Sequence, residues 1–168
     1  MFRWYQEATK CYVYMADVVD LESGFQSSVW FSRGWTLQEL IAPGTVEFYA
    51  SDEAFLGTRS SLELLINKAT RISLNALRGE NLAKISVDER LSWAVNRKTG
   101  QEEDQAYCQC AICAVTLQTN QLTSSSIGLL GISDVSMPII YGEGRKRASN
   151  RLYDEIQRYT SSTYTQIL

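Results

Sequence analysis

The fold is decided by residues 32–42, Ser-Arg-Gly-Trp-Thr-Leu-Gln-Glu-Leu-Ile-Ala, and by the apolar segments on either side of them. This stretch predicts a short helix that ends at Pro43-Gly44, because proline lacks the N–H that would continue the helix. Before it, the unbroken run Cys11-Tyr12-Val13-Tyr14-Met15 is typical of a strand buried on both faces of a parallel sheet. After it, Thr45-Val46-Glu47-Phe48-Tyr49-Ala50 alternates in polarity and predicts a second strand. Strand, helix and strand in this order predict an α/β fold with a parallel sheet of about two strands.

The remainder of the chain is predicted to be a mostly helical subdomain. Ser60-x-x-Glu63 and Ser86-x-x-Glu89 match the capping box, in which the serine oxygen accepts an N–H of the first helical turn. Two further helices are expected at about 101–108 and 143–158, and a loose tail at 160–168. The apolar stripes expected to face inward are Leu62, Leu65, Ile66 and Ala69, then Leu91, Ala94 and Val95, and finally Ala148, Leu152, Ile156 and Tyr159.

Two segments near the start complete the expected order of elements. Residues 1–9 carry apolar side chains at helical spacing and predict the last turns of a helix. Residues 16–28 predict an acidic loop.

Composition places the chain among ordinary soluble globular domains. It has 168 residues, of which 45% are apolar and 21% charged, with a net charge of -3, so we expect one domain with a substantial core. No apolar run approaches the ~18–20 residues of a membrane span, and no secretory leader opens the chain. We therefore expect a cytoplasmic protein that binds no membrane. A sequence pI near 5.1 argues against nucleic-acid binding, which depends on many Lys and Arg contacts to phosphates.

The chain contains no histidine, which limits the chemistry open to it. Nucleophile pairs with His, His-ligated metals and imidazole acid–base catalysis are excluded together. Cys108, Cys110 and Cys113 form a C-x-C-x2-C pattern that could hold zinc or an iron–sulfur cluster, with distant Cys11 or a carboxylate as fourth ligand. Structural zinc sites usually combine two ligand pairs, so we expect no metal and interpret the four cysteines as free thiols of a reducing compartment.

Several sequence blocks resemble one family. The central block is Trp35-Thr36-Leu37-Gln38-Glu39-Leu40-Ile41-Ala42-Pro43, and the others follow in the family's order along almost the whole chain. They are Phe2-Arg3-Trp4-Tyr5, Cys11-Tyr12-Val13-Tyr14, Gly57-Thr58, Arg90-Leu91-Ser92-Trp93-Ala94, Glu102-Glu103-Asp104-x-Ala106-Tyr107-Cys108 and Met137-Pro138-x-x-Tyr141-Gly142-Glu143-Gly144. Together they resemble the fungal heterokaryon-incompatibility (HET) domain. The resemblance implies a fungal protein of non-self recognition that triggers programmed cell death when different hyphae fuse.

The chain departs from the family in two places. The family's domain begins with two strands, carrying Ser-Tyr-x-Trp-Gly-like and Trp-x-Asp-x-x-Cys-Ile-Asn-like motifs, that are absent before Met1. We therefore expect residues 1–159 to be the C-terminal part of a HET domain, a fragment that is inactive alone. Residues 109–128 contain no charged residue and interrupt a segment that is continuous in the family. Two interpretations stay open, a retained intron translated in frame and a genuine lineage-specific loop.

The HET domain is itself similar to Toll/interleukin-receptor (TIR) domains, which suggests a site on the predicted helix. In active TIR domains the glutamate of the matching helix cleaves the nicotinamide–ribose bond of NAD, and its counterpart here is Glu39. The resemblance thus implies Glu39 as catalytic residue, Trp35 and Arg33 as substrate-binding residues, and NAD as a substrate, with no cofactor. At about 100° per residue, Trp35 and Glu39 share the side of the helix opposite Leu37 and Leu40. Because nicotinamide leaves as a neutral molecule, one carboxylate is enough to stabilise the oxocarbenium-like transition state.

Each of these features also has a simpler interpretation. A glutamate on a helix surface is usually solvated, and Trp35 could serve packing alone, in which case the domain is a non-catalytic signalling module that acts through protein partners or self-association. The run Arg145-Lys146-Arg147 after Gly142-x-Gly144 predicts either a phosphate site or a solvated basic face. The acidic residues at 88–89 and 102–104 are explained by capping of helix starts.

Overall fold

A computed structural model describes residues 2–80, 82–108, 138 and 140–165. In this part of the chain, three strands form one sheet in the order β1-β2-β3. The strands β1 (Cys11–Tyr14) and β2 (Val46–Tyr49) are parallel, with Cys11 opposite Val46, and the helix α2 (Thr36–Ile41) lies in the connection between them. The predicted α/β fold with its crossover unit is therefore confirmed.

The third strand, β3 (Phe55–Thr58), was not predicted and pairs antiparallel with β2. Gly57 lets β3 pack closely against the residues just before the next helix, α3 (Glu63–Thr70). Its φ is 147°, and a Cβ there would lie 2.8 Å from Ser61 Oγ and 3.0 Å from Leu62 Cγ. Only glycine fits both the backbone angle and the close approach. A strand of four residues around such a glycine has too little alternation to be recognised from sequence.

One face of the sheet carries the core. Phe48 of β2 is fully buried, and its ring packs edge-on against Phe25 and Trp30, with centroids 5.5 and 5.7 Å apart. Phe25 and Trp30 belong to two short 3-10 helices, η1 (Phe25–Ser27) and η2 (Val29–Ser32), at the end of the predicted acidic loop and just after it. The predicted helix 32–42 is therefore shorter than expected, because its first residues belong to η2 and to a turn.

The other face of the sheet is open at β1, which contradicts the predicted double burial of this strand. Tyr12 and Tyr14 are 66% and 56% exposed, whereas Val13 between them is 2% exposed. Among the described residues, β1 forms an edge of the sheet and pairs with β2 alone.

The helices after the sheet confirm part of the predicted pattern. Ser86 caps α5 (Val87–Val95) as expected, because its side chain accepts the Glu89 N–H at 3.2 Å. The predicted Ser60 cap is wrong: α3 begins after Leu62, and Ser61 Oγ accepts the Thr58 N–H at 2.8 Å. The smaller elements are α1 (Phe2–Glu7), which lies within the helix expected at residues 1–9, α4 (Leu74–Leu77) and η3 (Leu82–Lys84).

The predicted buried residues agree with the structure on α3 and differ from it in part on α5. The stripe of α3 is confirmed, since Leu62 and Ile66 are buried and Leu65 and Ala69 half-buried. On α5 the predicted stripe is confirmed at Ala94, which is buried, and Leu91 is half-buried, but Val95 is wrong because it is 63% exposed. The buried positions of this region are Arg90, Trp93, Ala94 and Arg97, which have the i, i+3, i+4, i+7 spacing of a helix face.

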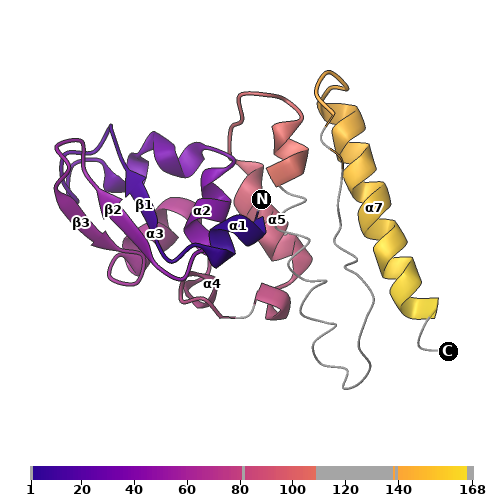
Figure 1. Ribbon diagram of the computed structural model, residues 1–168, viewed down its shortest axis with the longest axis horizontal. Coiled ribbons are helices and arrows are strands. Elements are labelled where there is room, and N and C mark those ends of the chain that lie inside the picture. Colours follow the sequence, from indigo (N-terminus) through magenta and orange to yellow (C-terminus); the bar gives the residue numbers. More distant parts are fainter. Residues whose placement is uncertain (1, 81, 109–137, 139, 166–168) are drawn as a thin grey trace.

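The last helix, α7 (Arg145–Thr165), lies at the end of the molecule opposite the sheet (Figure 1). Residues 104–108 are helical, beginning later than expected. Helix α7 continues past residue 158 into the segment where a tail was expected. Ala148 and Leu152 are buried as predicted, whereas the side chains of Ile156 and Tyr159 and all of residues 109–128 lie outside the described residues. No helix in the described ranges is long and apolar enough to span a membrane.

Candidate functional site

Glu39 lies on the side of α2 that faces α1 and is half-buried. Its Oε1 accepts a hydrogen bond of 3.2 Å from the Tyr5 hydroxyl. Burial, together with the Glu39 charge, raises the pKa of Tyr5 to about 12, so the phenol remains protonated at neutral pH. Burial and the same carboxylate also raise the pKa of the Cys11 thiol. Glu39 is therefore held by a neutral donor, and the described residues provide no hydrogen-bond partner for its second oxygen.

Trp35 precedes α2 at its N-cap and is also half-buried. Its Nε1 donates to Asp104 Oδ2 at 3.2 Å, and Asp104 Oδ1 accepts from the Tyr141 hydroxyl at 3.2 Å. Neighbouring Glu103 accepts the N–H groups of Gly142 and Gly144 at 2.9 and 3.0 Å. The acidic residues at 103–104 therefore connect α2 with the loop before α7. The interpretation of these residues as helix caps did not predict this connection.

The N-terminal end of α2 is held against residues 97–99. The Gly34 N–H donates to Lys98 O at 2.8 Å, and a Cβ on Gly34 would lie 2.4 Å from Thr99 Cγ2 and 3.1 Å from Cys108 Sγ. Arg97 Nη1 donates to Arg33 O and Thr36 Oγ1, both at 2.9 Å. Arg33 itself is exposed, and its backbone carbonyl rather than its side chain accepts the hydrogen bond from Arg97.

The C-terminal end of α2 is held by a second buried arginine, Arg59. Its guanidinium donates to the carbonyl oxygens of Leu40, Ile41, Pro43 and Gly44, at 2.8, 3.3, 2.9 and 3.1 Å. Burial lowers the pKa of Arg59, and the carbonyls at the end of the helix provide the partial negative charge that a cation needs there.

Sequence reasoning placed Trp35 and Glu39 on the side of the helix opposite Leu37 and Leu40. In the structure Leu37 and Leu40 are buried and Trp35 and Glu39 are half-buried, but Trp35 bonds to Asp104 and Glu39 to Tyr5. It missed Arg59 and Arg97, which position the same helix. The sequence did carry a signal for Arg97, because Arg90, Trp93, Ala94 and Arg97 have the spacing of one helix face. Arginine is rarely buried, however, so the prediction assigned the apolar residues 91, 94 and 95 to the core.

The pKa values of the two thiols near this site are raised, which favours the protonated thiol at neutral pH. Cys11 and Cys108 are free, and burial, aided by Asp104, raises the pKa of Cys108 to about 12. Within the described ranges, no group of three or more His, Cys, Asp or Glu side chains could hold a metal ion. Because Cys110 and Cys113 lie outside those ranges, the expected absence of a metal stays a prediction.

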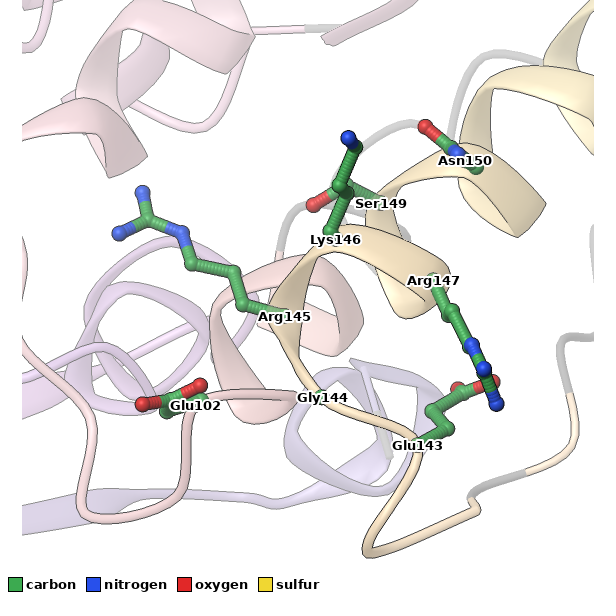
Figure 2. A pocket seen from close by; sticks show the side chains of 8 residues that line it. All are labelled: Glu102, Glu143, Gly144, Arg145, Lys146, Arg147, Ser149 and Asn150. Carbon is green, nitrogen blue, oxygen red and sulfur yellow. The ribbon is translucent and has the colours of Figure 1, made fainter.

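The basic run at the start of α7 borders a pocket of about 680 Å³ (Figure 2). Arg145 and Arg147 leave the helix in opposite directions, and all three basic residues of 145–147 are exposed. Glu102 and Glu143 line the same pocket, and Glu143 forms an ion pair with Arg151. Diverging cations mixed with carboxylates are typical of a solvated basic face, and the structure favours that interpretation over a phosphate site.

Comparison with known proteins gives one strong relative. The chain is 44% identical over 166 residues to the vegetative incompatibility protein HET-E-1 of Podospora anserina, an alignment that covers 93% of the chain. The chain spans about 11% of the length of that protein. No family model matches the chain. No solved structure matches it either.

Proposed function

We propose that this chain acts in heterokaryon incompatibility, as part of a fungal protein that recognises non-self and triggers programmed cell death. Its similarity to HET-E-1, a vegetative incompatibility protein, extends over nearly all of the chain and supports this role. The sequence blocks quoted above further support its assignment as a HET domain with TIR-like character. Action in the cytoplasm through protein partners or self-association belongs to the same proposal.

We further propose that the domain cleaves the nicotinamide–ribose bond of NAD at Glu39. The observation that carries this step is the half-buried carboxylate, held at one oxygen by the protonated Tyr5 hydroxyl, with the indole of Trp35 one helical turn away. Neutral nicotinamide leaves with the bonding electrons, and the carboxylate stabilises the positive charge on the ribose. Water then adds to the ribose carbon and releases a proton. Trp35 offers an aromatic surface for the nicotinamide ring.

The test is Glu39→Gln, made in a HET-E-1 chimera in which this chain replaces the matching segment. The glutamine oxygen still accepts the Tyr5 hydrogen bond, but the negative charge is gone. We expect nicotinamide release from NAD to fall by about a hundredfold or more and cell killing to be lost, because removal of a transition-state electrostatic contact has effects of this size. Thermal unfolding of the variant should match that of the parent chimera.

The matched control is Tyr5→Phe, which removes the same hydrogen bond and leaves the carboxylate in place. It should retain most of the killing activity. Full killing by Glu39→Gln would contradict catalysis at Glu39. Equal loss of activity and of melting temperature in both variants would show that the Tyr5–Glu39 contact has a structural role only.

A second candidate, the non-catalytic signalling module, is favoured by a specific feature of the sheet. The strand β1 lies at the sheet edge and exposes Tyr12 and Tyr14. Edge strands with exposed aromatic side chains pair readily with other chains. Killing by the Glu39→Gln chimera without nicotinamide release would support this alternative.

A further inference from the structure

A second pocket, of about 280 Å³, includes Arg97 in its lining. Residues from η1, η2, the end of α3 and the end of α5 line it, and neither Trp35 nor Glu39 is among them. We call it the Arg71–Arg97 pocket, after the two cations in its lining. Among the described residues no aspartate or glutamate lines it, in contrast to the pocket at the start of α7.

The hydroxyl groups of this pocket already donate to other acceptors. Those of Ser27, Ser32, Thr70 and Ser92 donate to backbone carbonyls at 2.6–3.1 Å, and that of Ser28 donates to Asp17 at 2.8 Å. Asp17 also accepts the Val29 N–H at 2.7 Å, so each of its two oxygens already has a hydrogen-bond donor. The donors that have no partner among the described residues belong to the side chains of Gln26, Arg71, Trp93, Asn96 and Arg97.

Two of these donors are buried. Arg97 is 6% exposed and Trp93 is 4% exposed, and both Arg97 Nη2 and Trp93 Nε1 have no hydrogen-bond partner in the described part of the chain. Burial lowers the pKa of Arg97 to about 10, so its guanidinium is still charged at neutral pH. A buried cation with an unsatisfied N–H is costly unless an anion or acceptor completes its hydrogen bonds.

The rest of the pocket suits a small organic anion. Arg71 is exposed and supplies a second guanidinium, which can form a bidentate hydrogen bond with a phosphate. Phe31, Ala69 and the Trp93 ring give the pocket apolar walls. Its volume is near the lower end of the roughly 300–1,000 Å³ of ligand pockets, which limits the ligand to about the size of a sugar phosphate.

We propose that the Arg71–Arg97 pocket binds a small phosphate monoester, with the phosphate between the two guanidinium groups and the organic part against Phe31 and Trp93. This inference does not rest on catalysis at Glu39. Phosphate is favoured over a carboxylate because its three terminal oxygens and its higher negative charge suit two guanidinium groups, each of which carries several N–H donors.

The test compares the full chain with two variants that each remove one positive charge. Arg71→Asn removes the exposed cation of the pocket. Arg71 has a φ of 62°, a conformation that asparagine tolerates well, so the fold should be retained. Lys84→Asn is the matched control, because Lys84 is exposed and lies outside the pocket. Binding of glycerol phosphate, inorganic phosphate and acetate is measured by calorimetry at constant ionic strength.

We expect glycerol phosphate to bind the parent chain and Lys84→Asn equally, and to bind Arg71→Asn at least about tenfold more weakly. Asn96→Ala should weaken binding less, about twofold to threefold, because it removes one neutral donor. Equal affinities in all the proteins, or no binding to any, would overturn the proposal. Equal affinity for acetate would overturn the phosphate assignment, and binding of inorganic phosphate without glycerol phosphate would overturn the assignment of an organic ester.

Discussion

The two ends of α2 are both held by a buried arginine, but in different ways. Arg59, at the C-terminal end, donates to four carbonyl oxygens where the helix dipole is negative. Arg97, at the N-terminal end, lies where the helix dipole is positive, and its Nη2 has no partner within the described residues. Each arginine keeps one buried nitrogen without a partner among the described residues, Nε of Arg59 and Nη2 of Arg97, and Arg97 in addition lines the Arg71–Arg97 pocket.

The largest expected difference in stability is between two variants, each of which replaces one of the two arginines. Arg59→Met keeps most of the side-chain volume but leaves the buried carbonyls of Leu40 and Pro43 without a donor. Since each such group costs about 1–3 kcal/mol, we expect the free energy of unfolding to fall by about 3 kcal/mol or more. Arg97→Met should lower it by only about 1 kcal/mol, because the Arg33 carbonyl keeps the Thr36 hydroxyl as a donor at 2.8 Å and the change removes a more deeply desolvated cation.

Urea unfolding of the two variants measures this difference directly. If Arg97→Met proves as destabilising as Arg59→Met, the two ends of α2 are equivalent, and the structural argument for a ligand at Arg97 is weakened.

A smaller effect is expected from Gly34→Ala, at the N-terminal end. The new methyl group would lie 2.4 Å from Thr99 Cγ2, so the two segments must separate, at a cost of about 2 kcal/mol. Adding Thr99→Ser removes that methyl group and keeps the hydroxyl that donates to Gln101 O at 2.7 Å. Thermal unfolding should show partial recovery in the double variant. Destabilisation that is unchanged by Thr99→Ser would mean that this end of α2 is not held by close packing at Gly34.

The smallest expected effect is a change in how stability depends on pH, and it concerns the contact between Tyr5 and Glu39 of α2. The pKa of Tyr5 is raised to about 12 in the folded state, mainly by burial and then by Glu39. Because the unfolded phenol titrates near 10, the stability that Tyr5 contributes is complete below pH 10 and is lost as the pH rises towards 12. Tyr5→Phe should therefore flatten the decline in stability between pH 10 and 12, as measured by urea unfolding at each pH. An identical decline in the variant would show that the Tyr5–Glu39 contact does not hold α1 to α2.

Local sequence was enough to predict α2, β1 and β2, because each has a distinct pattern. Pro43 ends the helix, and Leu37 and Leu40 define its buried side. The placement of Trp35 and Glu39 on a different side followed from helical geometry alone. The short strand β3 and the true cap of α3 were missed, because Gly57 and Ser61 take their roles from contacts that the chain makes only when folded.

Sequence by itself determined the α/β class, the absence of histidine chemistry, the helix that carries Glu39 and the resemblance to incompatibility proteins. Only the tertiary structure decided which polar groups are buried, and that is how Arg59, Arg97 and Asp104 became part of the description of α2. The physical reason is that burial of a charged side chain depends on acceptors supplied from distant segments. Arg97 meets the carbonyl of Arg33, and Trp35 meets Asp104, only after the chain has folded.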